Sequence, residues 1–281
     1  MKSIAGIAVH KAGSVVFQKL LSRYAKDAGL AVDPLSRHFS ASPLPQAEIL
    51  RKLEVDIKPE GAFYGVIRSP HFSAMTRLKD LRLIAQVRDP RDCLTSHYFS
   101  LAFSHNPPKH PDKRDAFLAR RSAVKSMTID EFVLGSAALF EDRFQQVANL
   151  WKRYPGMLVC KYETMVERPN EWRADAADFF GLKMTSQLAR DLDRLASFNV
   201  DREDISRHKR QVTPGDHLRK LKPETINLLN SRFSTLIRTF GYEIAAQLPP
   251  TTISKPTLTT VAKHPRRSTS TSSKPISKIR E

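Results

Sequence analysis

The chain has 281 residues, 41% hydrophobic and 27% charged, which is ordinary for a globular protein and long enough for one sizeable domain or at most two small ones. Its net charge of +17 is unusually high and predicts an anionic partner such as a nucleotide, nucleic acid, membrane surface or acidic glycan. No apolar run approaches the length of a membrane span, and none resembles a signal peptide. Cys93 and Cys160 are the only two cysteines and lie far apart, so neither a disulfide framework nor a zinc site is indicated. They are typical of buried thiols in a reducing compartment, and we expect a cytoplasmic protein.

The N-terminal residues predict a strand, a small-residue turn and a helix. Residues 4–9 are mostly apolar, the turn Lys11-Ala-Gly-Ser14 follows, and apolar residues then recur at helical spacing. This order directs backbone N–H groups and the positive end of a helix dipole at whatever lies above the turn. Gly13 permits close approach, Ser14 adds a hydroxyl and Lys11 adds a charge. The turn is a candidate oxyanion site, although an ordinary strand–helix connection has the same pattern. It is not a Walker A loop, in which the lysine follows the glycines.

A second strand–helix junction lies at residues 83–96. An apolar run over 83–87 predicts a buried strand, and Asp89-Pro90 supplies a helix cap and a first helical residue. Arg88 then ends the strand and Ser96 lies on the helix, at the edge where open α/β sheets bind ligands. An arginine fork and a hydroxyl can together hold a phosphate. The alternative is that Arg88 pairs with Asp92 while Ser96 faces water.

The remaining pattern predicts an α/β fold with a mostly parallel central sheet flanked by helices. Further strands are expected at residues 62–67 and 157–162, and helices at about 46–53, 93–100, from 128, 174–182, 188–195 and 223–241. Residues 78–81 are expected to be a short connector. Apart from the helix at 46–53, the segments 30–60, 105–114 and 202–222 are expected to be loops, the last two basic and flexible.

The composition changes after Pro249-Pro250. Residues 249–281 contain seven Lys and Arg residues, a single acidic residue, Glu281, and few large apolar side chains. Such a composition is typical of disorder. We therefore expect one folded domain over residues 1–248 and a basic Ser/Thr/Pro-rich tail over 249–281, which could bind nucleic acid weakly.

Several segments together resemble the sulfotransferases that use 3'-phosphoadenosine-5'-phosphosulfate (PAPS). They are Lys11-Ala-Gly-Ser14, Val87-Arg-Asp-Pro-Arg-Asp92 with Ser96, Lys161-Tyr162-Glu163 and Phe240-Gly-Tyr242. A late Arg-Lys-Gly-x-x-Gly-Asp segment of that family closes over the nucleotide. Arg210 to Asp216 keeps its arginine and Gly-Asp but departs from it at Gln211 and Val212. The resemblance spans about residues 4–243 and implies a P-loop NTPase-like three-layer sandwich.

The resemblance also implies a site. The turn amides and Ser14 would bind the 5'-phosphosulfate, Lys11 would stabilise the leaving phosphate, and Arg88 with Ser96 would read the 3'-phosphate. No metal would be required. The implied cofactor-binding residues are Lys11, Ala12, Gly13, Ser14, Val15, Arg88, Ser96, Tyr162, Arg210 and Gly215.

The catalytic candidates are Lys11 and His71. His71 ends the segment Arg68-Ser-Pro-His71 after the strand at 62–67 and is the candidate base for an acceptor hydroxyl or amine. The alternative is that His71 is an ordinary solvent-exposed histidine. His38 and Glu163 are further candidates for the base.

Two other functions remain open at this point. A small-molecule or nucleoside kinase would explain a phosphate site, but the chain lacks the Walker lysine and an obvious magnesium carboxylate. A non-enzymatic anion- or nucleic-acid-binding protein would explain the tail, but not the ordered strand-end motifs. The acceptor is not identified by the sequence. The Lys and Arg residues in the loops at 30–60 and 104–126 slightly favour a carbohydrate or anionic acceptor.

Overall fold

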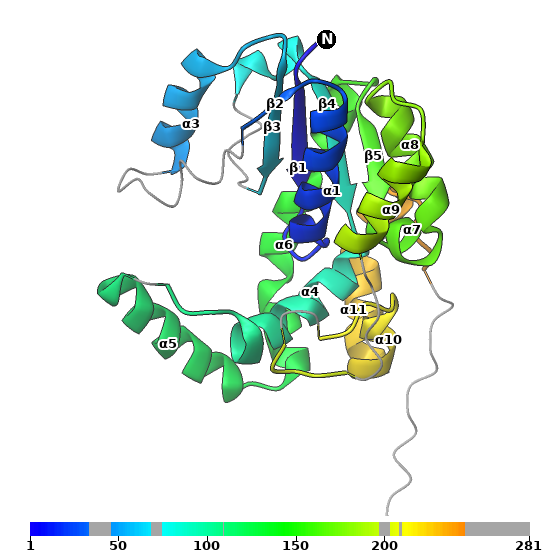
Figure 1. The fold of residues 1–281 in the computed structure, drawn as a ribbon. Coiled ribbons are helices and arrows are strands. Elements are labelled where there is room, and N and C mark those ends of the chain that lie inside the picture. Colours follow the sequence, from blue (N-terminus) through cyan, green and yellow to red (C-terminus); the bar gives the residue numbers. More distant parts are fainter. Residues whose placement is uncertain (34–45, 69–74, 109, 197–202, 208–209, 245–281) are drawn as a thin grey trace, which may run out of the picture. The chain divides into compact units, whose positions relative to one another are not determined.

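The protein is built on a parallel five-stranded sheet. The computed structural model describes residues 1–33, 46–68, 75–108, 110–196, 203–207 and 210–244, and Met1–Pro250 form one compact unit. The strand order is β2-β3-β1-β4-β5, and each neighbouring pair runs parallel (Figure 1). The strands are β1 (Ile4–Ala8), β2 (Ala31–Asp33), β3 (Ala62–Ile67), β4 (Arg82–Val87) and β5 (Leu158–Lys161). The predicted α/β fold with a parallel sheet is therefore confirmed.

The central strands are buried on both faces, which explains their continuous apolar sequence. Alternate residues point to opposite faces, so Ala5 and Ile7 of β1 join one core cluster and Ile4 and Ala8 join the other. Helices cover both faces and complete a three-layer arrangement (Figure 1). One layer contains α1 (Ser14–Asp27), α7 (Tyr162–Glu167), α8 (Pro169–Phe179) and α9 (Ser186–Leu195); the other contains α4 (Pro90–Phe99), α6 (Ile129–Arg153), α11 (Pro223–Arg232) and α12 (Ser234–Thr239).

The helix starts follow local signals in the sequence. The Asp89 side chain accepts a hydrogen bond from the Arg91 amide at 2.9 Å, and Pro90 takes the first helical position of α4. Thr128 caps α6 in a reciprocal capping box with Glu131. Cys93 and Cys160 are buried free thiols, as predicted. Among the described residues, no helix has the length and apolar character needed to cross a bilayer.

Several predictions about loops were wrong. Residues 111–114 belong to α5 (Pro111–Lys125), because a proline at the first helical position loses no hydrogen bond. The described part of 202–222 contains α10 (Asp216–Lys220) and buries Arg210, because ion pairs compensate its charges. The short strand β2 was missed, and the helix expected over 223–241 is divided at Phe233. The other helices of the described residues are α3 (Gln46–Asp56), η2 (Thr76–Asp80) and the π-helical η3 (Ser100–Ser104).

Candidate functional site

The predicted site residues gather at the carboxyl edge of the sheet. The register pairs Ala8 of β1 with Gln86 of β4, and Val87 of β4 with Lys161 of β5. The segments that leave these strands therefore emerge side by side. They are the Lys11–Ser14 turn, Arg88 and Tyr162, which three separate parts of the chain supply.

The Lys11–Ser14 turn presents an uncapped helix start. Gly13 lies in the left-handed region at φ 73° and precedes α1, whose first turn has no side-chain cap and no acidic residue. The Ala12 amide is occupied, since it donates to the Val9 carbonyl at 3.2 Å, whereas Ser14 and Val15 begin the helix. Free N–H groups and the helix dipole both favour an anion here.

Two further features show that this turn is under strict steric control. Lys11 has φ 72°, a left-handed conformation that non-glycine residues seldom adopt and that is enriched at functional sites. At Gly13 a Cβ atom would lie 2.8 Å from the Tyr162 ring, so only glycine fits against that ring. Tyr162 thus sets how closely the turn approaches α7.

The Lys11 ammonium lies in a buried, cationic environment. Burial lowers the pKa of Lys11 to about 8, and the positive charges of Arg88 and Arg210 act in the same direction. The side chain is still mainly charged at neutral pH. A phosphate or sulfonate beside it would restore the charge balance, because an anion favours the protonated lysine.

Arg88 is held from three sides. Its guanidinium lies 4.4 Å from the centre of the Tyr162 ring, 3.4 Å from Asp92 Oδ2 and 3.5 Å from the Lys11 carbonyl. Its Nε is buried and has no hydrogen-bond partner in the described part of the chain. The ion pair between Arg88 and Asp92, which the sequence left open as an alternative, is therefore present. It leaves the Arg88 Nε–H group available to a ligand. Ser96 lies one helical turn beyond Asp92, half-buried, on the same face of α4.

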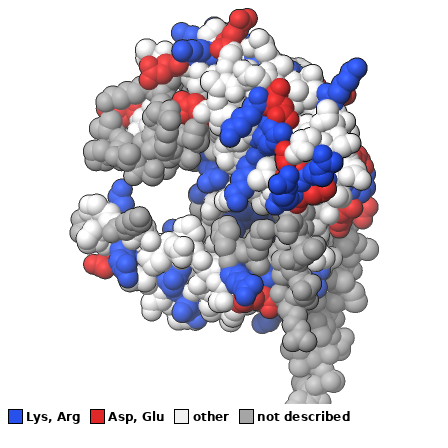
Figure 2. Space-filling model, in the orientation of Figure 1, with Lys and Arg blue, Asp and Glu red and all other residues white. Residues whose placement is uncertain are grey.

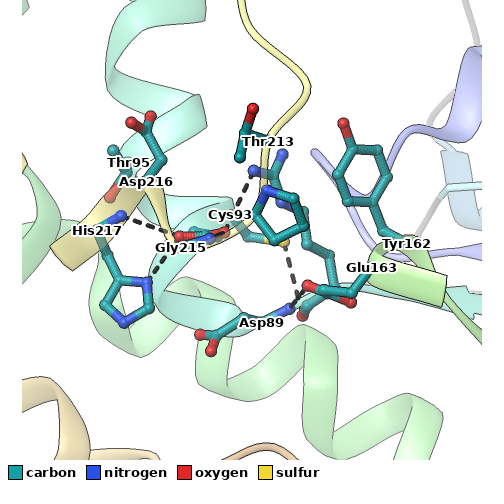
Figure 3. Close-up of polar contacts among 12 residues, drawn as sticks. Asp89, Cys93, Thr95, Tyr162, Glu163, Thr213, Gly215, Asp216 and His217 are labelled. Atoms are coloured by element: carbon teal, nitrogen blue, oxygen red, sulfur yellow. Dashed lines mark hydrogen bonds and ion pairs between the residues drawn. The ribbon is translucent and has the colours of Figure 1, made fainter. Parts of the chain in front are cut away.

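Asp92 is the centre of this network. It is fully buried and accepts hydrogen bonds from the backbone amides of Gly215 at 2.8 Å and His217 at 2.9 Å. The His217 Nδ1 lies 2.7 Å from the same carboxylate (Figure 3). Although burial alone would raise the pKa of Asp92, the His217 hydrogen bond and Arg88 hold it below its usual range. Asp92 therefore ties the loop before α10 to the arginine at the sheet edge.

The late basic segment is ordered by its own ion pairs. Arg210 is buried, pairs with Glu203 and Asp216, and lies 4.1 Å from the centre of the Phe99 ring. The amide of Gly215 is already engaged by Asp92. Both predicted cofactor residues thus lie near the site, but their polar groups have protein partners. The Tyr162 hydroxyl donates to the Val212 carbonyl at 3.0 Å and joins the same loop to α7.

The candidates for the base are not brought together with Lys11 in the described residues. His71 and His38 lie outside the described part of the chain. Glu163 is half-buried, and both of its oxygens accept hydrogen bonds, from the Asp89 amide at 2.9 Å and from the Tyr242 hydroxyl at 3.1 Å. These contacts give Glu163 a structural role. Within the described ranges, no group of three or more His, Cys, Asp or Glu side chains is placed to hold a metal ion.

Sequence reasoning missed His217 and treated Asp92 only as a possible partner of Arg88. The spacing of Arg88 and Asp92 was the available signal for Asp92, since residues four apart share a helix face. His217 carries no local signal, because its partner is 125 positions away in the chain.

Comparisons with known proteins identify the family and the fold. The sulfotransferase domain family matches residues 7–224. The structure of a mouse sulfotransferase, SULT7A1, complexed with PAP is similar at 16% identity, with a TM-score of 0.59 and 84% of each chain covered. Retinol dehydratase with androsterone and the inactive cofactor PAP matches at 15% identity, with a TM-score of 0.49 and coverage of 88% of this chain and 82% of that one. No curated protein matches.

The likeness to the mouse structure shows the shared fold, and the family match covers most of the chain, including the Lys11–Ser14 turn, Arg88 and Asp92. That match decides against the kinase and the non-enzymatic alternatives. The chain belongs to the sulfotransferase domain family.

Proposed function

We propose that the protein transfers the sulfuryl group of PAPS to a hydroxyl or amine of an acceptor by in-line displacement. The observation that carries this proposal is the contact between the two halves of the site. Arg88 Nη1 lies 3.5 Å from the Lys11 carbonyl. The guanidinium group that would bind one phosphate therefore lies next to the Lys11–Ser14 turn, which would bind another anion. One nucleotide with phosphates at its 3' and 5' positions would span both. The PAP named in the two structures above has that arrangement.

Each half of the site then has a separate task. The first turn of α1 and the Ser14 hydroxyl bind the 5'-phosphosulfate, and Arg88 with Ser96 binds the 3'-phosphate. Tyr162 fixes both halves, since its ring contacts Gly13 and Arg88. Arg210 and Gly215 hold the loop before α10 over the nucleotide rather than donating to it directly.

The reaction forms a bond from the acceptor oxygen or nitrogen to sulfur and breaks the bond from sulfur to the 5'-phosphate oxygen, releasing PAP. Lys11 stabilises the charge that develops on that oxygen, which is electrostatic stabilisation of the kind that dominates phosphoryl transfer. The acceptor proton passes to a base, for which His71 remains the candidate. We further propose a cytoplasmic location, a catalytic domain over residues 1–248 and no catalytic role for the tail at 249–281.

The test follows PAP formation from PAPS with a panel of sugar, phenol, sterol and amine acceptors. Lys11→Met should lower kcat by about 100-fold or more, the scale seen when one oxyanion donor is removed. Because the pKa of Lys11 is about 8, kcat/KM should fall as the pH rises through that value and the ammonium is lost.

Lys11→Arg is the matched control, because its charge persists at alkaline pH and the decline near pH 8 should disappear. ATP serves as the competing donor. Consumption of ATP with no consumption of PAPS would contradict the proposal, as would unchanged turnover in Lys11→Met.

A further inference from the structure

A second polar cluster lies next to Lys11, on the side of β1 that faces α6. It consists of His10, His97, Arg143 and Gln146 and is called the Arg143 cluster below. The His10 and His97 rings are 5.0 Å apart. Three members surround the Phe140 ring, whose centre lies 6.3 Å from His10, 5.5 Å from His97 and 5.5 Å from the Arg143 guanidinium.

Several polar atoms of the Arg143 cluster lack partners, although Gln146 Nε2 donates to the exposed Asp142 carboxylate at 2.9 Å. His10 Nδ1, His97 Nδ1, Arg143 Nε, Arg143 Nη1 and Gln146 Oε1 are shielded from solvent, and none makes a hydrogen bond within the described part of the chain. A buried polar group left without a partner costs about 1–3 kcal/mol, and such groups call for an explanation such as a bound ligand or water. Five such atoms in one cluster, four of them from the residues around the Phe140 ring, indicate a site that a ligand completes.

The two histidines of the cluster lie among positive charges, while Arg143 and Gln146 also lie near the exposed Asp142 carboxylate. Burial, together with His97 and the cationic Lys11, lowers the pKa of His10 to about 2. Burial, Lys11 and Arg120 lower the pKa of His97 to about 3. Both imidazoles are therefore neutral at neutral pH, first because burial disfavours the charged form and second because the surrounding charges are positive. An anion bound here would relieve that repulsion.

A small cleft opens at the cluster. It is lined by Ala8, Val9, His10, Arg68, Arg143, Gln146 and Val147, with no Asp or Glu among these residues. The cleft is small and partly open to solvent, so it has room for a single group of a larger molecule and not for a whole ligand. Figure 2 shows Lys and Arg side chains beside the hollow next to α5.

We propose that the Arg143 cluster is an acceptor subsite for an oxyanion group, a carboxylate or a sulfate, carried next to the hydroxyl or amine that receives the sulfuryl group. Arg143 donates to the oxyanion, His10 and His97 donate through imidazole N–H groups, and Gln146 Oε1 accepts from a neighbouring hydroxyl. The inference rests on the sulfotransferase function proposed above, because Lys11 adjoins both the subsite and the leaving phosphate.

The test measures binding of inorganic sulfate to the PAP-saturated protein by calorimetry, so that the nucleotide site is already occupied. Arg143→Gln should weaken sulfate binding at least about 10-fold. Arg153→Gln is the matched control, since Arg153 is exposed on the same helix and should leave binding unchanged. The PAP affinity of each variant, measured in the same series, shows that the fold and nucleotide site are intact.

Two matched pairs then distinguish the source of the anion: methyl glucuronide against methyl glucoside, and 4-hydroxybenzoate against 4-hydroxybenzamide. A charged member that binds at least about 10-fold better than its neutral partner in wild type, and not in Arg143→Gln, supports the subsite and identifies the class. Sulfate binding that is absent, or equal in Arg143→Gln and Arg153→Gln, overturns the inference while PAP binding leaves the proposed function standing. Absence of PAP binding overturns the proposed function instead.

Discussion

Lys11 lies between two clusters of polar side chains with buried polar atoms. The clusters differ in how many of those atoms have a hydrogen-bond or ion-pair partner within the protein. On one side, Asp92 accepts hydrogen bonds from Gly215 and His217 and pairs with Arg88. On the other side, five polar atoms of the Arg143 cluster have no partner within the described residues, although Gln146 Nε2 donates to Asp142. The first network is organised before any ligand binds, whereas the second is completed only by one.

This difference separates two ways of gaining specificity. Contacts with Asp92, Tyr162 and the Lys11 carbonyl hold Arg88 in one geometry and leave its Nε available, so little ordering remains to be lost when a nucleotide binds. Unpaired donors instead reject ligands that cannot satisfy them, because those donors then stay buried and unpaired. We therefore expect the nucleotide half of the site to fix geometry and the Arg143 cluster to select the acceptor.

The largest effect is expected from breaking the Asp92 network. Asp92→Asn removes the charge opposite Arg88 and places an amide donor among groups that themselves donate. Loss of one member of a buried ion pair typically costs about 3–5 kcal/mol. We expect a decrease of that size in the free energy of unfolding, measured by urea denaturation.

The control is Asp178→Asn, on the exposed face of α8, which should change the free energy of unfolding by less than about 0.5 kcal/mol. A loss in Asp92→Asn no greater than in this control would show that the network does not stabilise the fold.

A smaller effect is expected at the turn that both clusters flank. Gly13→Ala would set a Cβ atom 2.8 Å from the Tyr162 ring, in addition to straining the backbone at φ 73°. Gly29→Ala shares the strain, at φ 71°, but nothing lies within 4 Å of its Cβ position. We expect about 1 kcal/mol of destabilisation at Gly29 and roughly 1–3 kcal/mol more at Gly13, because overpacking adds to the strain.

PAP affinity in the same two variants sharpens this comparison, since only Gly13 belongs to the proposed site. Equal losses of stability and of PAP affinity in both alanine variants would mean that the contact with Tyr162 has no influence on the turn.

The sequence predicted the local parts of this site and missed the distant ones. The Lys11–Ser14 turn and the Arg88 junction were visible because strand, cap and helix signals are contiguous in the chain. His217 and Arg143 could not be identified in this way, because their neighbours are distant in the sequence. His217 contacts Asp92, and Arg143 lines a cleft with His10. The segment 202–222 was expected to be a flexible loop because its charge is unlike that of a core, yet Arg210 is buried through its pairing with Glu203 and Asp216.

The central claim is that Arg88 reads the 3'-phosphate of a nucleotide whose 5' end lies at the Lys11–Ser14 turn. Calorimetry with PAP and with ADP, on wild type and on Arg88→Ala, tests it most directly. Wild type should bind PAP at least about 10-fold more tightly than ADP, and Arg88→Ala should lose that preference while its ADP affinity stays the same, which also shows that the variant is folded. Equal affinity of wild type for the two nucleotides, or a preference for PAP that survives in Arg88→Ala, would contradict the account.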